Sequence, residues 1–161
     1  MKLTFVFVGG HKEAWLKELS DGYQKKLSYF FKTEILRVKP SQIARESADL
    51  KLKQECKAIL KLVEPQDFLV LCDERGKLLT SVKFSHQFVK WCENQKSRIV
   101  FVIGGAYGAN EELKGRANYQ MSLSELTFNH HLAQLVVLEQ VYRAISIWKN
   151  LPYHNDEFKG S

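Results

Sequence analysis

The sequence has little of what defines several protein classes. Its 161 residues include only 3 Cys and 3 Pro, and no two cysteines have Cys-x-x-Cys spacing. We therefore expect a reducing, cytoplasmic location without disulfides or structural zinc. The longest nearly apolar run, residues 99–109, is interrupted by glycines and is well short of the roughly 20 residues that a membrane span needs. No small-residue cleavage site follows the first apolar segment, so we expect no secretory signal and no membrane partner.

Metal-binding and phosphate-binding fingerprints are also missing. His130 and His131 are adjacent, which is not the spacing that helical zinc ligands use, so no metal site is expected. The glycines of the segment 104–108 match neither Gly-x-Gly-x-x-Gly nor a P-loop, and Gly9-Gly10 is too sparse for a dinucleotide fingerprint.

What the sequence does contain is an alternation of strand-like and helix-like segments, typical of one α/β domain over residues 1–161 with a mostly parallel sheet. The run 99–103 is β-branched throughout most of its length and predicts a strand buried on both faces. The expected strands are 3–8, 35–38, 68–72, 99–103 and 119–123. Apolar residues at helical spacing predict helices over 13–30, 52–63, a segment containing 84–91, 110–117 and 131–149.

Positive charge is concentrated in the first part of the chain. The net charge is +6, and residues 1–64 hold 13 Lys and Arg against 8 Asp and Glu, which leaves a surplus of +5 there. The densest part comprises Lys25, Lys26, Lys32, Lys51, Lys53, Lys57 and Lys61. This pattern fits a solvated helix surface and a surface that faces a polyanion equally well.

Three expected strand ends carry residues suited to ligand binding: 72–76, 104–108 and 123–128. In a parallel sheet, ligands bind outside the carboxyl ends of the strands. Glycines after a buried strand let the backbone approach a ligand closely. Three such loops on one sheet edge favour a small-molecule site over turns that serve only packing.

The helix expected over 131–149 is apolar nearly all round, which predicts burial in the fold or in a subunit interface. Within it, Glu139 and Arg143 are four residues apart with the acid first, the favourable order for an ion pair. Buried charges are costly without partners, so a functional role is favoured over a surface salt bridge.

Five motifs in order resemble a known family over the whole chain: LCDERGK (71–77), FVIGGAYG (101–108), SLSELTFNH (122–130), EQVYRA (139–144) and PYH (152–154). They are similar to the bacterial ribosomal RNA large subunit methyltransferase H family, of the SPOUT class. The resemblance implies an α/β domain with a C-terminal trefoil knot and a homodimer. It also implies that S-adenosyl-L-methionine is the cofactor, and that the substrate is N3 of a pseudouridine in 23S rRNA.

The resemblance also implies the site residues. The cofactor contacts would be Cys72, Gly104, Leu123, Ser124, Glu125, Leu126, Thr127 and Phe128. Among the catalytic residues, His154 would be the general base, Arg143 would stabilise developing charge and Glu139 would orient Arg143. Tyr153 would stack on the flipped base or hydrogen-bond to it. The chain departs from the family at Cys72, usually Leu, and at Gln134, where an Arg that would face RNA phosphate is common.

Two other functions stay open at this point. One is a catalytically idle module that binds RNA or the ribosome on the same fold, which Gln134 favours. The other is a nucleotide- or flavin-binding domain, disfavoured because the glycines follow the fourth strand and not the first. The expected partner is 23S rRNA, in the assembled ribosome or free, with no DNA partner.

Overall fold

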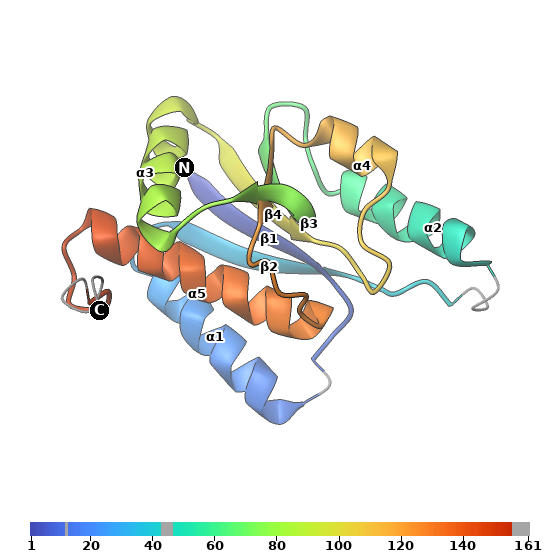
Figure 1. Ribbon diagram of the computed structural model, residues 1–161, viewed down its shortest axis with the longest axis horizontal. Coiled ribbons are helices and arrows are strands. Elements are labelled where there is room, and N and C mark those ends of the chain that lie inside the picture. The colour runs from blue at the N-terminus through green and yellow to red at the C-terminus, as the bar shows by residue number, and fades with distance from the viewer. Residues whose placement is uncertain (12, 43–46, 156–161) are drawn as a thin grey trace.

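The computed structural model describes residues 1–11, 13–42 and 47–155. Its centre is a five-stranded sheet in the order β2-β1-β4-β3-β5 (Figure 1), and every neighbouring pair is parallel. The strands are β1 (Lys2–Val8), β2 (Lys32–Val38), β3 (Phe68–Leu78), β4 (Arg98–Ile103) and β5 (Tyr119–Ser122). The predicted α/β class with a parallel sheet is confirmed. The trefoil knot and the single-domain organisation stay predictions.

Helices cover both faces of the sheet. They are α1 (Ala14–Ser28), α2 (Ala48–Leu60), α3 (Ser81–Asn94), α4 (Glu111–Arg116) and α5 (His130–Trp148). Helices α1, α3 and α5 lie on one face, and α2 and α4 on the other (Figure 1). No helix in the described part of the chain is long and apolar enough to cross a membrane.

Alternating strand residues divide the core between the two faces. Phe5 and Phe101 stack at 5.3 Å between ring centroids on the side of α3 and α5. Val6 and Val102 belong to the second core cluster, with Ile59 of α2. This two-sided burial explains why β4 reads as an unbroken apolar run.

Strand β3 differs from the prediction, which ends it at Cys72 and places a turn over 73–77. The strand continues to Leu78, and both Cys72 and Lys77 are register partners of Met121 on β5. The residues between them form an excursion from the sheet, so the turn residues are present but the chain then resumes the same strand. Gly76 lies so close to β5 that a Cβ there would be 2.5 Å from the Met121 carbonyl carbon.

Helix α1 also differs in the face that it buries. The four-residue spacing of Trp15, Leu19, Tyr23 and Leu27 suggests one buried face, yet Trp15 is 51% exposed and Leu19 is 46% exposed. Each step of four residues turns a helix about 40° beyond a full rotation, so the stripe drifts around the helix. At the start of α1 the buried position is Leu16 instead.

Candidate cofactor pocket and polar cluster of helix α5

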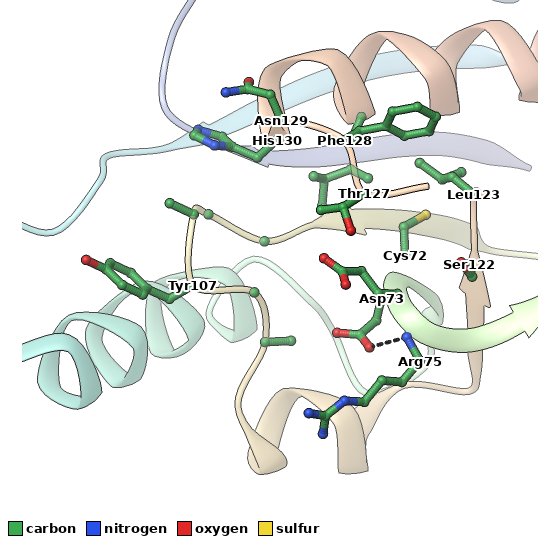
Figure 2. Close-up of a pocket in the computed structure, with 18 of the residues that line it drawn as sticks. Cys72, Asp73, Arg75, Tyr107, Ser122, Leu123, Thr127, Phe128, Asn129 and His130 are labelled. Carbon is green, nitrogen blue, oxygen red and sulfur yellow. Dashed lines mark hydrogen bonds between the residues drawn. The ribbon is translucent and has the colours of Figure 1, made fainter. Parts of the chain in front are cut away.

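A pocket lies at the carboxyl edge of the sheet, where parallel α/β sheets bind ligands. Its volume is about 600 Å³, within the range of small-molecule sites. The irregular middle of β3, around residues 72–75, and the segments that follow β4 and β5 line it together with the first turn of α5 (Figure 2). The three strand ends singled out in the sequence therefore meet in one place.

Glycines shape the wall that follows β4. A Cβ at Gly104 would lie 2.4 Å from the carbonyl oxygen of Gly108, so only glycine fits at position 104. Gly108 has a φ of +79°, a backbone conformation that favours glycine. The Gly108 N–H donates to the Gly105 carbonyl at 3.0 Å, which closes the loop on itself. This wall offers backbone and no bulky side chain over most of its length.

The wall that follows β5 is held by short-range hydrogen bonds. The Ser122 hydroxyl donates to the Ser124 carbonyl at 2.8 Å, and the Leu126 N–H donates to the Ser124 hydroxyl at 2.9 Å. Asn129 then caps α5 by accepting the His131 N–H at 2.9 Å. The segment between β5 and α5 is thus ordered without secondary structure of its own.

Seven of the eight predicted cofactor residues line the pocket. They are Cys72, Gly104, Leu123, Ser124, Leu126, Thr127 and Phe128. Glu125 is exposed and is not among the lining residues. The lining residues Asp73, Arg75, Tyr107, Asn129 and His130 were missed. The sequence could have identified them, because they adjoin the named residues at the same strand ends.

The β3 excursion forms a polar side of the pocket. The carboxylate of Asp73 accepts the Arg75 N–H at 2.9 Å (Figure 2). Just before it, burial raises the pKa of the Cys72 thiol to about 12. The thiol is therefore neutral near pH 7 and serves the pocket as a small apolar group, not as a nucleophile.

The four predicted catalytic residues form one cluster. Nη2 of Arg143 donates to Glu139 Oε1 at 2.6 Å, and Nε donates to the same oxygen at 2.9 Å. The Tyr153 hydroxyl donates to Glu139 Oε1 at 3.1 Å, and Nη1 of Arg143 lies 3.0 Å from Nδ1 of His154. The Arg143 guanidinium also lies over the Tyr153 ring, 4.8 Å from its centroid. The i, i+4 ion pair that the sequence predicts is therefore present, together with the two tail residues.

A second layer of polar groups supports this cluster. The Tyr23 and Tyr153 hydroxyls lie 3.1 Å apart, and Nε2 of Gln140 donates to the second carboxylate oxygen of Glu139 at 2.6 Å. The Ser81 hydroxyl in turn donates to Gln140 Oε1 at 2.8 Å. Burial alone would lower the pKa of Arg143, but the hydrogen bonds and charge of Glu139 raise it. Burial, Tyr23 and Glu139 raise the pKa of Tyr153. Arg143 is thus held charged and Tyr153 neutral.

The tail reaches the cluster through the turn that ends α5. Asn150 has a φ of +53°, and its N–H donates to the Ile147 carbonyl at 3.3 Å. The Leu151 N–H donates to the Ser146 carbonyl at 2.8 Å. These are the two bonds of a Schellman motif, which reverses the chain at a helix end. The reversal brings Tyr153 and His154 back against α5.

The pocket and the cluster lie at different places on α5. The pocket contacts the helix at its first turn, through His130 and Ala133, whereas the cluster is centred on Arg143. At 1.5 Å per residue, Ala133 and Arg143 are about 15 Å apart along the helix. Within one chain, the two groups of predicted residues therefore do not share a site.

Gln134 does not face RNA, so the sequence expectation for this position is wrong. Its side chain is 3% exposed. Its Nε2 donates to the Val8 carbonyl at 3.2 Å, and its Oε1 accepts from Arg37 Nη1 at 3.2 Å. Nη1 of Arg37 also donates to the Gly9 carbonyl at 2.9 Å. Gln134 therefore links α5 to β1 and β2 through buried hydrogen bonds. Its presence is not evidence for a catalytically idle module.

Comparison with known proteins gives matches over nearly the whole chain. The family described as "Predicted SPOUT methyltransferase" matches residues 1–154. The ribosomal RNA large subunit methyltransferase H of Bdellovibrio bacteriovorus is 43% identical over 155 residues, which are 96% of this chain and 99% of that protein. The protein of the same name from Maridesulfovibrio salexigens is 40% identical over 156 residues, 96% and 98% of the two chains.

A solved structure with low sequence identity also matches. It is a Legionella pneumophila protein described as a methyltransferase, with the cofactor SAM bound. It is 15% identical, with a TM-score of 0.48 over 90% of this chain and 66% of that one.

The chain belongs to the SPOUT methyltransferase family. The prediction of a methyltransferase that uses S-adenosyl-L-methionine is thereby confirmed, and the flavin-binding alternative is set aside.

Proposed function

We propose that this chain methylates N3 of a pseudouridine in the 23S rRNA of the large ribosomal subunit. The observation that carries the proposal is the end-to-end similarity to relatives named ribosomal RNA large subunit methyltransferase H. The pocket and the cluster of α5 supply the two kinds of chemistry that such a reaction needs. An enzyme with this substrate works where ribosomes are, in the cytoplasm.

The pocket fits S-adenosyl-L-methionine. Its volume of about 600 Å³ suits a nucleoside with an amino-acid arm. The Gly104 wall lets backbone groups read the adenine edge, and the apolar side chains of Leu123, Leu126 and Phe128 are placed to cover the adenine faces. When bound, the cofactor supplies an electrophilic methyl group on a sulfonium sulfur.

The cluster of α5 suits the acceptor base. The N3 proton of pseudouridine is weakly acidic and flanked by two carbonyl oxygens, so a proton acceptor and a cation are both useful. Arg143 is the cation and Glu139 fixes its orientation. His154 is the candidate proton acceptor, and Tyr153, whose ring lies against the Arg143 guanidinium, is the candidate to stack on the base or to hydrogen-bond to it.

The contact between Arg143 and His154 sets an order of events. An arginine only donates, so Nδ1 of His154 accepts from Nη1 of Arg143. His154 takes the N3 proton through Nδ1 only once Arg143 turns this donor toward a carbonyl oxygen of the base. Entry of the base and activation of His154 are thereby coupled.

A second copy of the chain resolves the separation of pocket and cluster. Leu132 on α5 is exposed, as are Trp15 and Leu19 on α1. The two helices pack side by side and run in the same direction (Figure 1). Exposed large apolar side chains on two neighbouring helices favour a protein partner.

Two-fold symmetry across α5 joins the two groups of residues. An axis perpendicular to α5 near the middle of the helix makes the two copies antiparallel, so the pocket end of one meets the cluster end of the other. We therefore propose a homodimer in which each site takes its cofactor from one protomer and Arg143 and His154 from its partner.

Mixing two inactive variants tests the shared site. Gly104→Ala damages the pocket and His154→Ala damages the cluster. A mixed dimer keeps one site with both parts intact, so random mixing should restore about a quarter of wild-type activity by counting. Subunit exchange is verified with tagged protomers. If the activity of the mixture then stays at background, both parts of the site belong to one protomer.

The central experiment is transfer of labelled methyl from S-adenosyl-L-methionine to ribosomes and, separately, to naked 23S rRNA. Both come from cells that lack an enzyme of this family. Label on a single pseudouridine is the expected result, and the two substrates show whether assembly is required. If the protein binds the cofactor but transfers methyl to neither ribosomes nor naked 23S rRNA, the proposed substrate is wrong. Absence of cofactor binding would favour the idle module.

A further inference from the structure

Tyr107 is an exposed aromatic side chain at the pocket that neither the cofactor contacts nor the catalytic cluster uses. It lies in the loop after β4 and is 45% exposed. Its ring points away from Asp73 and Thr127 and out over α2 (Figure 2). The ammonium group of Lys51, on α2, lies 5.6 Å from the centre of the ring.

The loop that carries Tyr107 is held firmly on both sides. Gly105 and Gly108 are bridged across it, with the Gly108 N–H donating at 3.0 Å. On the inner side, a Cβ at Gly105 would lie 3.0 Å from the carboxylate of Glu55, which is buried in α2. The ring is therefore presented to solvent by a tightly packed backbone. An aromatic ring fixed in this way loses little conformational freedom when a flat partner stacks on it.

The helix beneath the ring presents mainly positive charge. Lys53 and Lys57 are exposed on α2, Lys51 is half-buried against Tyr107, and Lys61 follows at the helix end. Of the acidic residues of α2, Asp49 is exposed and Glu55 is 4% exposed. An accessible ring with a basic side chain beside it, here Lys51, is the pattern that binds single-stranded nucleic acid, since the ring stacks on a base and the cation pairs with a phosphate.

We propose that Tyr107 and Lys51 form a platform that holds one unpaired nucleotide of the RNA substrate beside the pocket. The Tyr107 ring stacks on its base, and the Lys51 ammonium pairs with a phosphate. The platform rests on the proposed function, because it presumes that the substrate is RNA. Its role is to fix the register of the strand while the target base reaches the methyl group, so it is a positioning element and not part of the chemistry.

The test compares Tyr107→Ala, Tyr107→Phe and Lys51→Ala with wild type. Stacking on an aromatic residue contributes enough that its removal should weaken binding of naked 23S rRNA about 10-fold or more. Tyr107→Phe keeps the ring and should bind within about two-fold of wild type. Lys51→Ala should lower the dependence of log affinity on log salt by about one. Tyr29→Ala is the matched control, because Tyr29 is 82% exposed at the far end of α1.

Separate readouts keep the platform distinct from the pocket and from the proposed function. RNA affinity is measured by filter binding without cofactor, cofactor affinity by calorimetry, and the Michaelis constant for ribosomes by methyl transfer. If Tyr107→Ala loses as much affinity for the cofactor as for RNA, Tyr107 is a lid on the cofactor and the proposal is overturned. The proposal is also overturned if Tyr107→Ala binds RNA as tightly as wild type. Absence of methyl transfer by wild type would refute the proposed function, while the filter-binding comparison would still decide the platform.

Discussion

Nη1 of Arg143 lies 3.0 Å from Nδ1 of His154, and Arg143 is in turn fixed by Glu139. Because the guanidinium cannot accept a hydrogen bond, Nδ1 of His154 is the acceptor in this contact. The pair joins the end of the chain to the middle of α5. It makes the position of His154 depend on Arg143, whose Nη1 covers Nδ1 of the imidazole.

Replacing His154 tests its role as base. His154→Ala should lower the single-turnover rate of methyl transfer about 100-fold or more, the usual contribution of a positioned proton acceptor. Cofactor affinity should stay unchanged, because His154 is not among the residues that line the pocket. His86→Ala, on α3, is the control variant. A His154→Ala rate equal to that of wild type would remove the base assignment.

The need for glycine at position 104 can be tested by comparison with Gly22, a glycine in open surroundings. Gly104→Ala places a Cβ 2.4 Å from the Gly108 carbonyl oxygen, so the loop must move. We expect a loss of about 1–3 kcal/mol in the free energy of unfolding and at least about 10-fold weaker cofactor binding in calorimetry. Gly22→Ala, with no atom within 4 Å of its Cβ, should stabilise α1 by about 0.4–1 kcal/mol and leave cofactor binding unchanged. Equal behaviour of the two variants would contradict the role of Gly104.

Cys72 should be chemically quiet in the folded protein. With its pKa raised to about 12, only about one thiol in ten thousand is ionised at pH 8. Alkylation by iodoacetamide, mapped by peptide mass spectrometry, should be more than about 100-fold slower at Cys72 than in the urea-unfolded chain. Similar rates in the two states would show that the thiol is neither buried nor neutral.

Glu55 should make stability fall as pH rises. Burial raises the pKa of Glu55, and Lys51 and the Ser41 backbone only partly offset this. The folded state therefore binds this proton more tightly than the unfolded state, so the contribution of Glu55 is full at low pH and is lost as pH rises through the folded pKa. Glu55→Gln should gain stability relative to wild type as pH increases from 4.5 to 7.5 in urea titrations. The exposed Glu18→Gln is the control, and a pH-independent difference for Glu55→Gln would contradict the prediction.

The sequence predicted some elements closely because a single local signal determined them. Strand β4 is observed within one residue of its predicted start, since a strand buried on both faces is apolar at every position. Glu139 and Arg143 were paired by helical spacing alone. The three strand ends met because parallel strands share one carboxyl edge.

Other features depend on contacts that no local pattern encodes. The resumption of β3 after Cys72 needs the backbone of β5 beside Gly76. The return of His154 to α5 depends on the left-handed conformation of Asn150, in a turn with no glycine. Gln134 was read as an outward position because the partner that buries it, Arg37, comes from another part of the chain.

The shared register of Cys72 and Lys77 opposite Met121 has a consequence for how this fold diversifies. Both ends of the excursion pair with the same residue of β5, so the length and composition of 73–75 are uncoupled from strand alignment, whereas Gly76 is fixed by its contact with Met121. Insertions or substitutions there would remodel one rim of the pocket while every other strand pair kept its register. The fold thus contains a segment in which the choice of acceptor could change between lineages while the inherited sheet stayed the same.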